Sequence, residues 1–83
     1  MVYERFIQGS RWTYQYARRP GNDGQWYTRE IRKSSGKPTA WRPLLAGQNL
    51  ELNSHVDPDD PPATFEIEGW LFRRVRISVR LPG

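Results

Sequence analysis

Apolar and polar residues alternate with a period of two along most of this chain, and this alternation limits the possible folds more than any other feature. It is clearest over residues 65–81, where most odd positions are apolar and most even positions are polar or charged. A period of two places successive side chains on opposite faces of a β-strand, whereas an amphipathic helix has a period near 3.6. No segment of ten or more residues shows a clear helical stripe. The chain is therefore predicted to be mainly β.

Gly69 is the only break in this alternating segment. A single strand of 17 residues is unusually long for a small domain, so we expect either a sharp bend or a hairpin at this glycine. A three-residue loop, Glu68 to Trp70, keeps the alternation in phase and sets Ile67 opposite Leu71. We favour this hairpin over a bent strand.

A second hairpin is predicted at residues 20–24, where Pro, Gly, Asn, Asp and Gly form a dense cluster of turn-forming residues. A four-residue loop sets Tyr16 opposite Tyr27 and keeps apolar side chains together. A five-residue loop instead sets Tyr14 opposite Glu30. Because the loop length fixes which side chains share a face, we prefer the four-residue loop.

The other expected elements are shorter. Val2–Gln8 and Leu50–Leu52 are predicted to be strands, residues 39–46 either a strand or a single helical turn, and residues 53–62 a Pro- and Asp-rich loop. Together these elements predict one small β domain over residues 1–83. The expected fold is an antiparallel meander or a partly open β-barrel of about six short strands, with at most one short helical turn.

The composition favours a folded domain with a thin core. Leu, Ile, Val and Phe total only 17 residues, but the net charge is a modest +4, and four Trp and four Tyr add apolar area. The absence of Cys excludes disulfides and thiolate zinc sites. No apolar run is long enough to span a membrane and no signal peptide is recognisable, so we expect a soluble, cytoplasmic protein.

Charge is distributed in three blocks. Residues 1–42 carry nine Lys or Arg and three acidic residues, residues 43–72 carry six acidic and no basic residues, and residues 73–83 carry four Arg and no acidic residue. Arg outnumbers Lys eleven to two. The planar guanidinium suits paired contacts to phosphate or carboxylate and stacking on aromatic rings. The two basic segments are therefore the main functional signal in this sequence.

Arg side chains interleaved with aromatic residues on a sheet are typical of a nucleic-acid-binding protein. Alternate side chains along a strand lie about 6.5–7 Å apart, which is close to the phosphate spacing of a nucleic-acid backbone. We therefore predict a non-catalytic binding module that contacts the backbone and stacks on bases. The candidate contact residues are Arg18, Arg19, Trp26, Arg32, Lys33, Lys37, Phe72, Arg74, Arg76 and Arg80.

Two other functions compete with this prediction. The first is a small inhibitor or adaptor that binds a charged host protein, in the style of the anti-restriction or anti-CRISPR proteins of mobile elements. The second is a small nuclease using Glu30 or Glu66 with a nearby Arg and His55. The acidic segment after His55 lacks the ligand pattern of a calcium loop. We expect no catalytic residue, cofactor, metal or membrane partner, and a homodimer is possible through the terminal strand.

Overall fold

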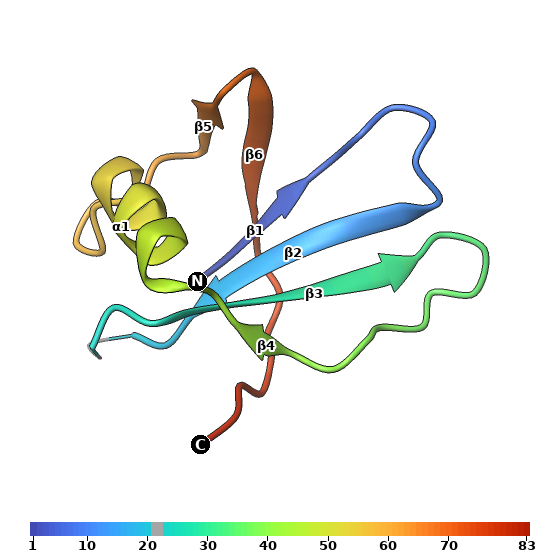
Figure 1. The fold of residues 1–83 in the computed structure, drawn as a ribbon, viewed down its shortest axis with the longest axis horizontal. Coiled ribbons are helices and arrows are strands. Elements are labelled where there is room, and N and C mark those ends of the chain that lie inside the picture. Colours follow the sequence, from blue (N-terminus) through green and yellow to red (C-terminus); the bar gives the residue numbers. More distant parts are fainter. Residues whose placement is uncertain (21–22) are drawn as a thin grey trace.

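The computed structural model describes residues 1–20 and 23–83, and within these residues the chain forms a six-stranded antiparallel sheet and one helix (Figure 1). The strand order is β4-β3-β2-β1-β6-β5. The elements are β1 (Val2–Arg5), β2 (Trp12–Arg18), β3 (Trp26–Arg32), β4 (Arg42–Pro43), α1 (Ala46–His55), β5 (Thr64–Ile67) and β6 (Trp70–Val75).

The sheet confirms the predicted fold class. All its strand pairs are antiparallel, and β1 lies in the middle because it pairs with both β2 and β6. The sheet is not closed into a barrel, since β4 and β5 are its two edges and do not pair with each other. The edge strand β4 has only two residues, one of which is Pro43, and proline restricts further pairing at an edge.

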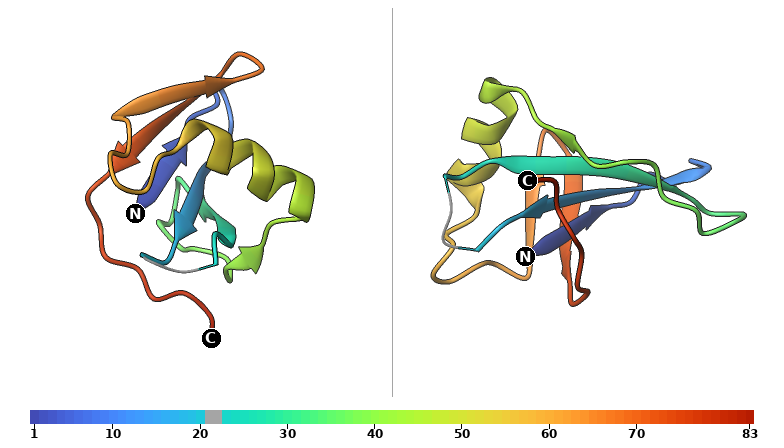
Figure 2. Two further views of the ribbon diagram at one scale, coloured as in Figure 1. Left: turned by 90° about the vertical axis from the view of Figure 1, so that its left-hand side faces the viewer. Right: turned by 90° about the horizontal axis from the view of Figure 1, so that it is seen from below.

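Helix α1 lies across one face of the sheet, while residues 76–83 run past the other face (Figure 2). The core lies between α1 and the sheet and is built from Tyr3, Trp26, Leu52, Val56 and Phe72. We call the face of the sheet that carries Tyr3 the helix-side face. Directly opposed residues in an antiparallel pair point to the same side of the sheet, and successive residues of a strand point to opposite sides. The strand register therefore assigns each of the remaining strand residues to one of the two faces.

The helix corrects the prediction of at most one helical turn, because α1 spans ten residues. It also replaces the strand predicted at Leu50–Leu52. Its inward stripe is Asn49, Leu52, Asn53 and Val56, at helical spacing, so half of that stripe is polar. Leu50, in contrast, is 73% exposed. The helix therefore has no apolar stripe to recognise.

Other boundaries also differ from the predictions. The first strand ends at Arg5 rather than Gln8. The segment 39–46 contributes the two-residue strand β4 and the first residue of α1. The predicted loop 53–62 begins inside the helix, which continues to His55.

The register of the β2–β3 hairpin is the one that we did not prefer: Tyr14 lies opposite Glu30 and Tyr16 opposite Thr28. Its loop, residues 20–24, falls partly outside the described residues. In this register Trp26 lies opposite Arg18, on the helix-side face that also carries Tyr16. The predicted register would have turned Trp26 to the other face. The burial of the Trp26 ring under α1 favours the observed register more strongly than the pairing of apolar residues along the strands favours the predicted one.

A hairpin does form at Gly69, as predicted, but its loop has two residues rather than three, and Ile67 lies opposite Trp70. Glu68 has a φ of 51° and Gly69 a φ of 83°. Positive φ at both central residues is the mark of a type I′ turn, whose twist matches that of the flanking strands. The shorter loop shifts the alternation by one residue. Phe72 therefore stacks on Phe65 in the core, with ring centroids 4.7 Å apart, and does not point outward as expected.

Strand β6 ends at Val75, although the alternation continues to Leu81. The ladder with β1 ends at Val75, which pairs with Val2, and the ladder with β5 ends at Arg73. The following segment instead lies near the first residues of the chain. Ile77, Val79 and Leu81 line a cavity of about 300 Å³ together with Met1 and Val2.

Candidate nucleic-acid interface

The two basic segments meet at one end of the sheet. Arg18 and Arg19 follow each other at the end of β2, and Arg74 lies near the end of β6. These three residues line a single cavity of about 390 Å³, and Asp59 is the one acidic residue among its described lining residues. Arg73, Arg74 and Arg76 line a neighbouring cavity of about 310 Å³. We call these five arginines (18, 19, 73, 74 and 76) the basic end.

Cations at the basic end have few partners. Arg18 donates to the Asn53 side chain at 3.2 Å, and Arg19 donates to the Tyr27 hydroxyl at 3.2 Å. The Nε of Arg18 is buried without a hydrogen-bond partner. Burial, followed by the charges of Arg74 and Arg18, lowers the pKa of the Met1 amino group. Positive charges therefore gather here with little compensation.

In the part of the chain that the structure describes, no arginine of the basic end forms an ion pair with a carboxylate. Among residues 1–20 and 23–83 the ion pair found within 4.0 Å is Glu30 with Arg42. Within the described residues, neither Asp59, which lines the same cavity, nor Glu66 or Glu68 has a carboxylate oxygen within 4.0 Å of an arginine nitrogen of the basic end. These guanidinium groups keep their capacity to bind an external anion.

The remaining predicted cations lie elsewhere. Arg32, Lys33 and Lys37 lie at the far end of the β2–β3 ladder, since Arg32 pairs with Trp12 and Arg18 with Trp26. Six residues of strand separate the two ends by about 20 Å. Arg80 is exposed on the C-terminal segment.

Two predicted stacking residues are buried. Trp26 is 0% exposed, and its indole N–H donates to Asn53 at 2.8 Å, while its backbone N–H donates to Asn49 at 3.0 Å. Phe72 is 5% exposed. Both predictions of surface contact are wrong, because the register and the shifted alternation turn these rings under α1.

The aromatic surface formed by other residues was not recognised from the sequence. Helix α1 covers only part of the helix-side face, and beyond it Arg5 lies against three rings. Its guanidinium carbon is 4.9 Å from the ring centroid of Tyr14, 5.1 Å from Trp70 and 5.8 Å from Tyr16. The sequence around Arg5 does not predict these contacts, because Tyr14 and Tyr16 belong to β2 and Trp70 belongs to β6.

Beside Arg5 lies a cavity of about 220 Å³ between α1 and the β5–β6 hairpin, which we call the Arg5 cavity. Its polar lining residues are Arg5, Gln48, Glu51 and Glu68. Its other lining residues are Tyr16, Leu44, Leu52, Ile67, Trp70 and Phe72. The Nε of Arg5 is buried, and no described residue accepts a hydrogen bond from it. An unmade hydrogen bond of a buried group costs about 1–3 kcal/mol.

The opposite face of the sheet carries a polar chain. Gln15, which is 2% exposed, donates to Glu4 at 2.8 Å and accepts from Arg29 at 2.8 Å. Arg29 stacks on Trp41, with its guanidinium carbon 4.3 Å from the ring centroid. Burial lowers the pKa of Arg29. The amide nitrogen and the amide oxygen of Gln15 thus each have a partner within the protein.

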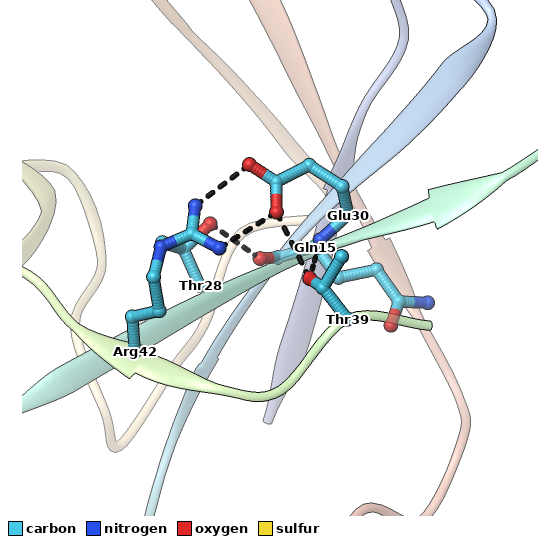
Figure 3. Close-up of polar contacts among 5 residues, drawn as sticks. All are labelled: Gln15, Thr28, Glu30, Thr39 and Arg42. Atoms are coloured by element: carbon cyan, nitrogen blue, oxygen red, sulfur yellow. Dashed lines mark hydrogen bonds and ion pairs between the residues drawn. The ribbon is translucent and has the colours of Figure 1, made fainter. Parts of the chain in front are cut away.

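Glu30, considered above as a catalytic carboxylate, is held by Arg42 and Thr39 (Figure 3). Arg42 donates to both carboxylate oxygens, at 2.6 and 2.8 Å, and the Thr39 hydroxyl donates to one of them at 3.0 Å. The hydrogen bond from Arg42 is the main reason why the pKa of Glu30 lies below its ordinary value. The group fastens the loop between β3 and β4.

His55 stacks on Phe65 with ring centroids 5.5 Å apart, at the end of α1.

Within the described part of the chain, no three His, Asp or Glu side chains gather as metal ligands would. The helix of that part is too short and too polar to cross a membrane.

No family model matches the chain, and neither the curated proteins nor the solved structures provide a match.

Proposed function

We propose that this protein is a non-catalytic binding module that contacts the phosphate backbone of a nucleic acid through its basic end. The observation that carries the proposal is the convergence of Arg18, Arg19 and Arg74 around one cavity, with Arg73 and Arg76 beside it. Guanidinium groups without carboxylate partners bind phosphates through paired, charge-assisted hydrogen bonds.

The test is binding to a single-stranded and a duplex oligonucleotide by isothermal titration over a series of salt concentrations. Affinity falls with salt because each phosphate contact releases counterions, with a slope of about −0.7 per contact for single strands and −0.9 for duplexes. An Arg74→Gln/Arg76→Gln variant should weaken binding and flatten the slope by about 1.4 to 1.8.

The matched control is Arg32→Gln/Lys37→Gln, which removes the same charge at the far end of the β2–β3 ladder. It should leave the slope near that of the unaltered protein. The absence of binding at low salt, or an equal loss in the control, would refute the proposal.

A protein partner is the second candidate, and exposed apolar side chains on α1 favour it. Leu45, which precedes the helix, is 76% exposed, and Leu50 is 73% exposed. Contiguous exposed apolar surface is typical of an interaction site, and these two leucines lie within five residues of each other. A partner bound in this way should be lost with Leu45→Ser/Leu50→Ser and retained by the Arg74→Gln/Arg76→Gln variant. The reverse pattern would assign the contact to the basic end.

A further inference from the structure

The Arg5 cavity combines groups that neither a simple anion nor a purely apolar ligand satisfies. Arg5 supplies donors, while Glu51 and Glu68 supply acceptors at the same cavity. The two carboxylates repel a free phosphate. The Nε of Arg5 is buried without a hydrogen-bond partner among the described residues, so one of the five guanidinium donors is unused within the protein.

The apolar lining favours a flat ring. Tyr16 and Trp70 lie against Arg5, and Trp70 is 39% exposed, so part of its ring remains open to a ligand. Base-on-aromatic stacking is a common way to hold an unpaired nucleotide. At about 220 Å³ the cavity is smaller than the sites that hold drug-sized ligands, and it suits one ring system.

We propose that the Arg5 cavity receives one unpaired nucleobase, with guanine preferred, from a single strand whose backbone lies on the basic end. Guanine presents O6 and N7 as acceptors for a guanidinium and its 2-amino group as a donor for a carboxylate. In this arrangement Arg5 donates to the base, Glu51 or Glu68 accepts from it, and Trp70 stacks on it. This inference rests on the proposed function and extends it from the backbone to the base.

The cavity and the basic end are close along β1, but the buried residues Tyr3 and Phe72 lie between them under α1, so a nucleic-acid strand that reaches both passes over the helix. Arg5 ends β1, while Val2 begins β1 and pairs with Val75, beside Arg74 and Arg76. Three residues of strand span about 10 Å. Arg5 and Arg74 also lie on the same face, since Arg5 is opposite Phe72 and Tyr3 is opposite Arg74.

The experiment compares four single-stranded octanucleotides by isothermal titration. One is uridine throughout, and the others carry a single central guanosine, adenosine or cytidine. The unaltered protein should bind the guanosine octamer about tenfold more tightly than the others, since a well-placed pair of hydrogen bonds discriminates bases on this scale.

Three variants test the residues of the cavity. Glu68→Gln and Glu51→Gln should reduce the preference for guanosine, and Arg5→Lys should do so because lysine keeps the charge but loses the planar, stacked fork. The matched control is Glu66→Gln, which removes the same charge from β5 at a position opposite Leu71, on the other face. It should keep the full preference. Circular dichroism confirms that each variant is folded.

The outcomes separate the two proposals. Equal binding of all four octamers, with the salt dependence intact, overturns the cavity proposal and leaves the backbone proposal standing. Loss of the guanosine preference in Glu66→Gln as much as in Glu68→Gln also overturns it. If no octamer binds at low salt, the backbone proposal fails, and the cavity proposal fails with it.

Discussion

Asn53 links three parts of the structure through one side chain. Its carbonyl oxygen accepts from the Trp26 indole at 2.8 Å and from Arg18 at 3.2 Å, and its amide donates to the Gly24 carbonyl at 3.0 Å. Since Trp26 is fully buried, its N–H has no water to replace this acceptor.

We predict that Asn53→Ala destabilises the protein by about 1–3 kcal/mol, because it leaves a buried donor unsatisfied. Urea unfolding followed by circular dichroism measures this change. Leu50→Ala, on the exposed side of the same helix, should cost less than about 0.5 kcal/mol. Equal losses in the two variants would contradict this role for Asn53.

Glu30 gives the fold a pH-dependent contribution. The hydrogen bond from Arg42 lowers the pKa of Glu30, so the stabilisation is fully present above the ordinary value of 4.5 and is lost as the pH falls through the lowered pKa. The Arg42 side chain is 51% exposed, so solvent screening limits the pair to about 0–1 kcal/mol.

Glu30→Gln should therefore lower the free energy of unfolding by up to about 1 kcal/mol at neutral pH. The difference from the unaltered protein should shrink as the pH falls below 4.5. Urea unfolding at a series of pH values measures it. A difference that stays constant down to low pH would show that Arg42 does not stabilise the ionised form.

At the scale of elements, the same substitution should have opposite effects at two glycines. Gly69 has a φ of 83° in the β5–β6 turn, and Gly47 lies within α1. Neither site has another atom within 4 Å of an added Cβ, so only the backbone conformation decides the outcome.

Gly69→Ala should destabilise the protein by about 1–2 kcal/mol, because a left-handed conformation is strained for an L-residue. Gly47→Ala should stabilise it by up to about 0.5 kcal/mol, because glycine weakens a helix and Gly47 lies in its first turn. Thermal unfolding of both variants measures the signs. Effects of the same sign would argue against the type I′ turn.

The sequence was sufficient to predict strands but not all of the elements. The class, the antiparallel arrangement and both hairpins follow from the period of two and the turn residues. Helix α1 could not be predicted, since Asn49 and Asn53 bury their amides against Trp26 where an apolar stripe is normally expected. The register failed for a related reason: it is set by the burial of Trp26 beneath a helix that the pattern does not reveal.

At the scale of the whole molecule, the C-terminal segment covers the sheet on the side away from α1. Ile77, Val79 and Leu81 face Met1 and Val2 across a shared cavity, and Val2 is 1% exposed. The cavity thus lies between the two ends of the described chain, and Ile77 at its rim is 47% exposed.

Removal of residues 77–83 should destabilise the protein by about 1–3 kcal/mol, because apolar surface around Val2 becomes exposed. Hydrogen exchange of the β1 amides and thermal unfolding measure the effect. Arg80→Ala, which changes the exposed charge only, should leave stability unchanged. A truncated chain as stable as the full one would show that this segment packs too weakly to matter.

The candidate interface could be predicted in part. Uneven charge identified Arg18, Arg19, Arg74 and Arg76, and the structure brings these four to one end. The Arg5 cavity could not be predicted, because its lining comes from β1, β2, α1 and the β5–β6 hairpin. Such a site depends on tertiary contacts that no local pattern records.

The distribution of the tryptophans gives the protein built-in optical reporters. Trp26 is fully buried in the core. The ring centroids of Trp12, Trp41 and Trp70, in contrast, lie 5.4, 4.3 and 5.1 Å from the guanidinium carbon of an arginine. Positive charge beside an indole draws in negatively charged quenchers and repels positively charged ones. Iodide should therefore dim the red-edge emission while caesium spares it, and neither should reach the blue-edge emission of Trp26. Intrinsic tryptophan fluorescence therefore distinguishes ligand binding at the surface from changes in the packing of the core, without an attached label.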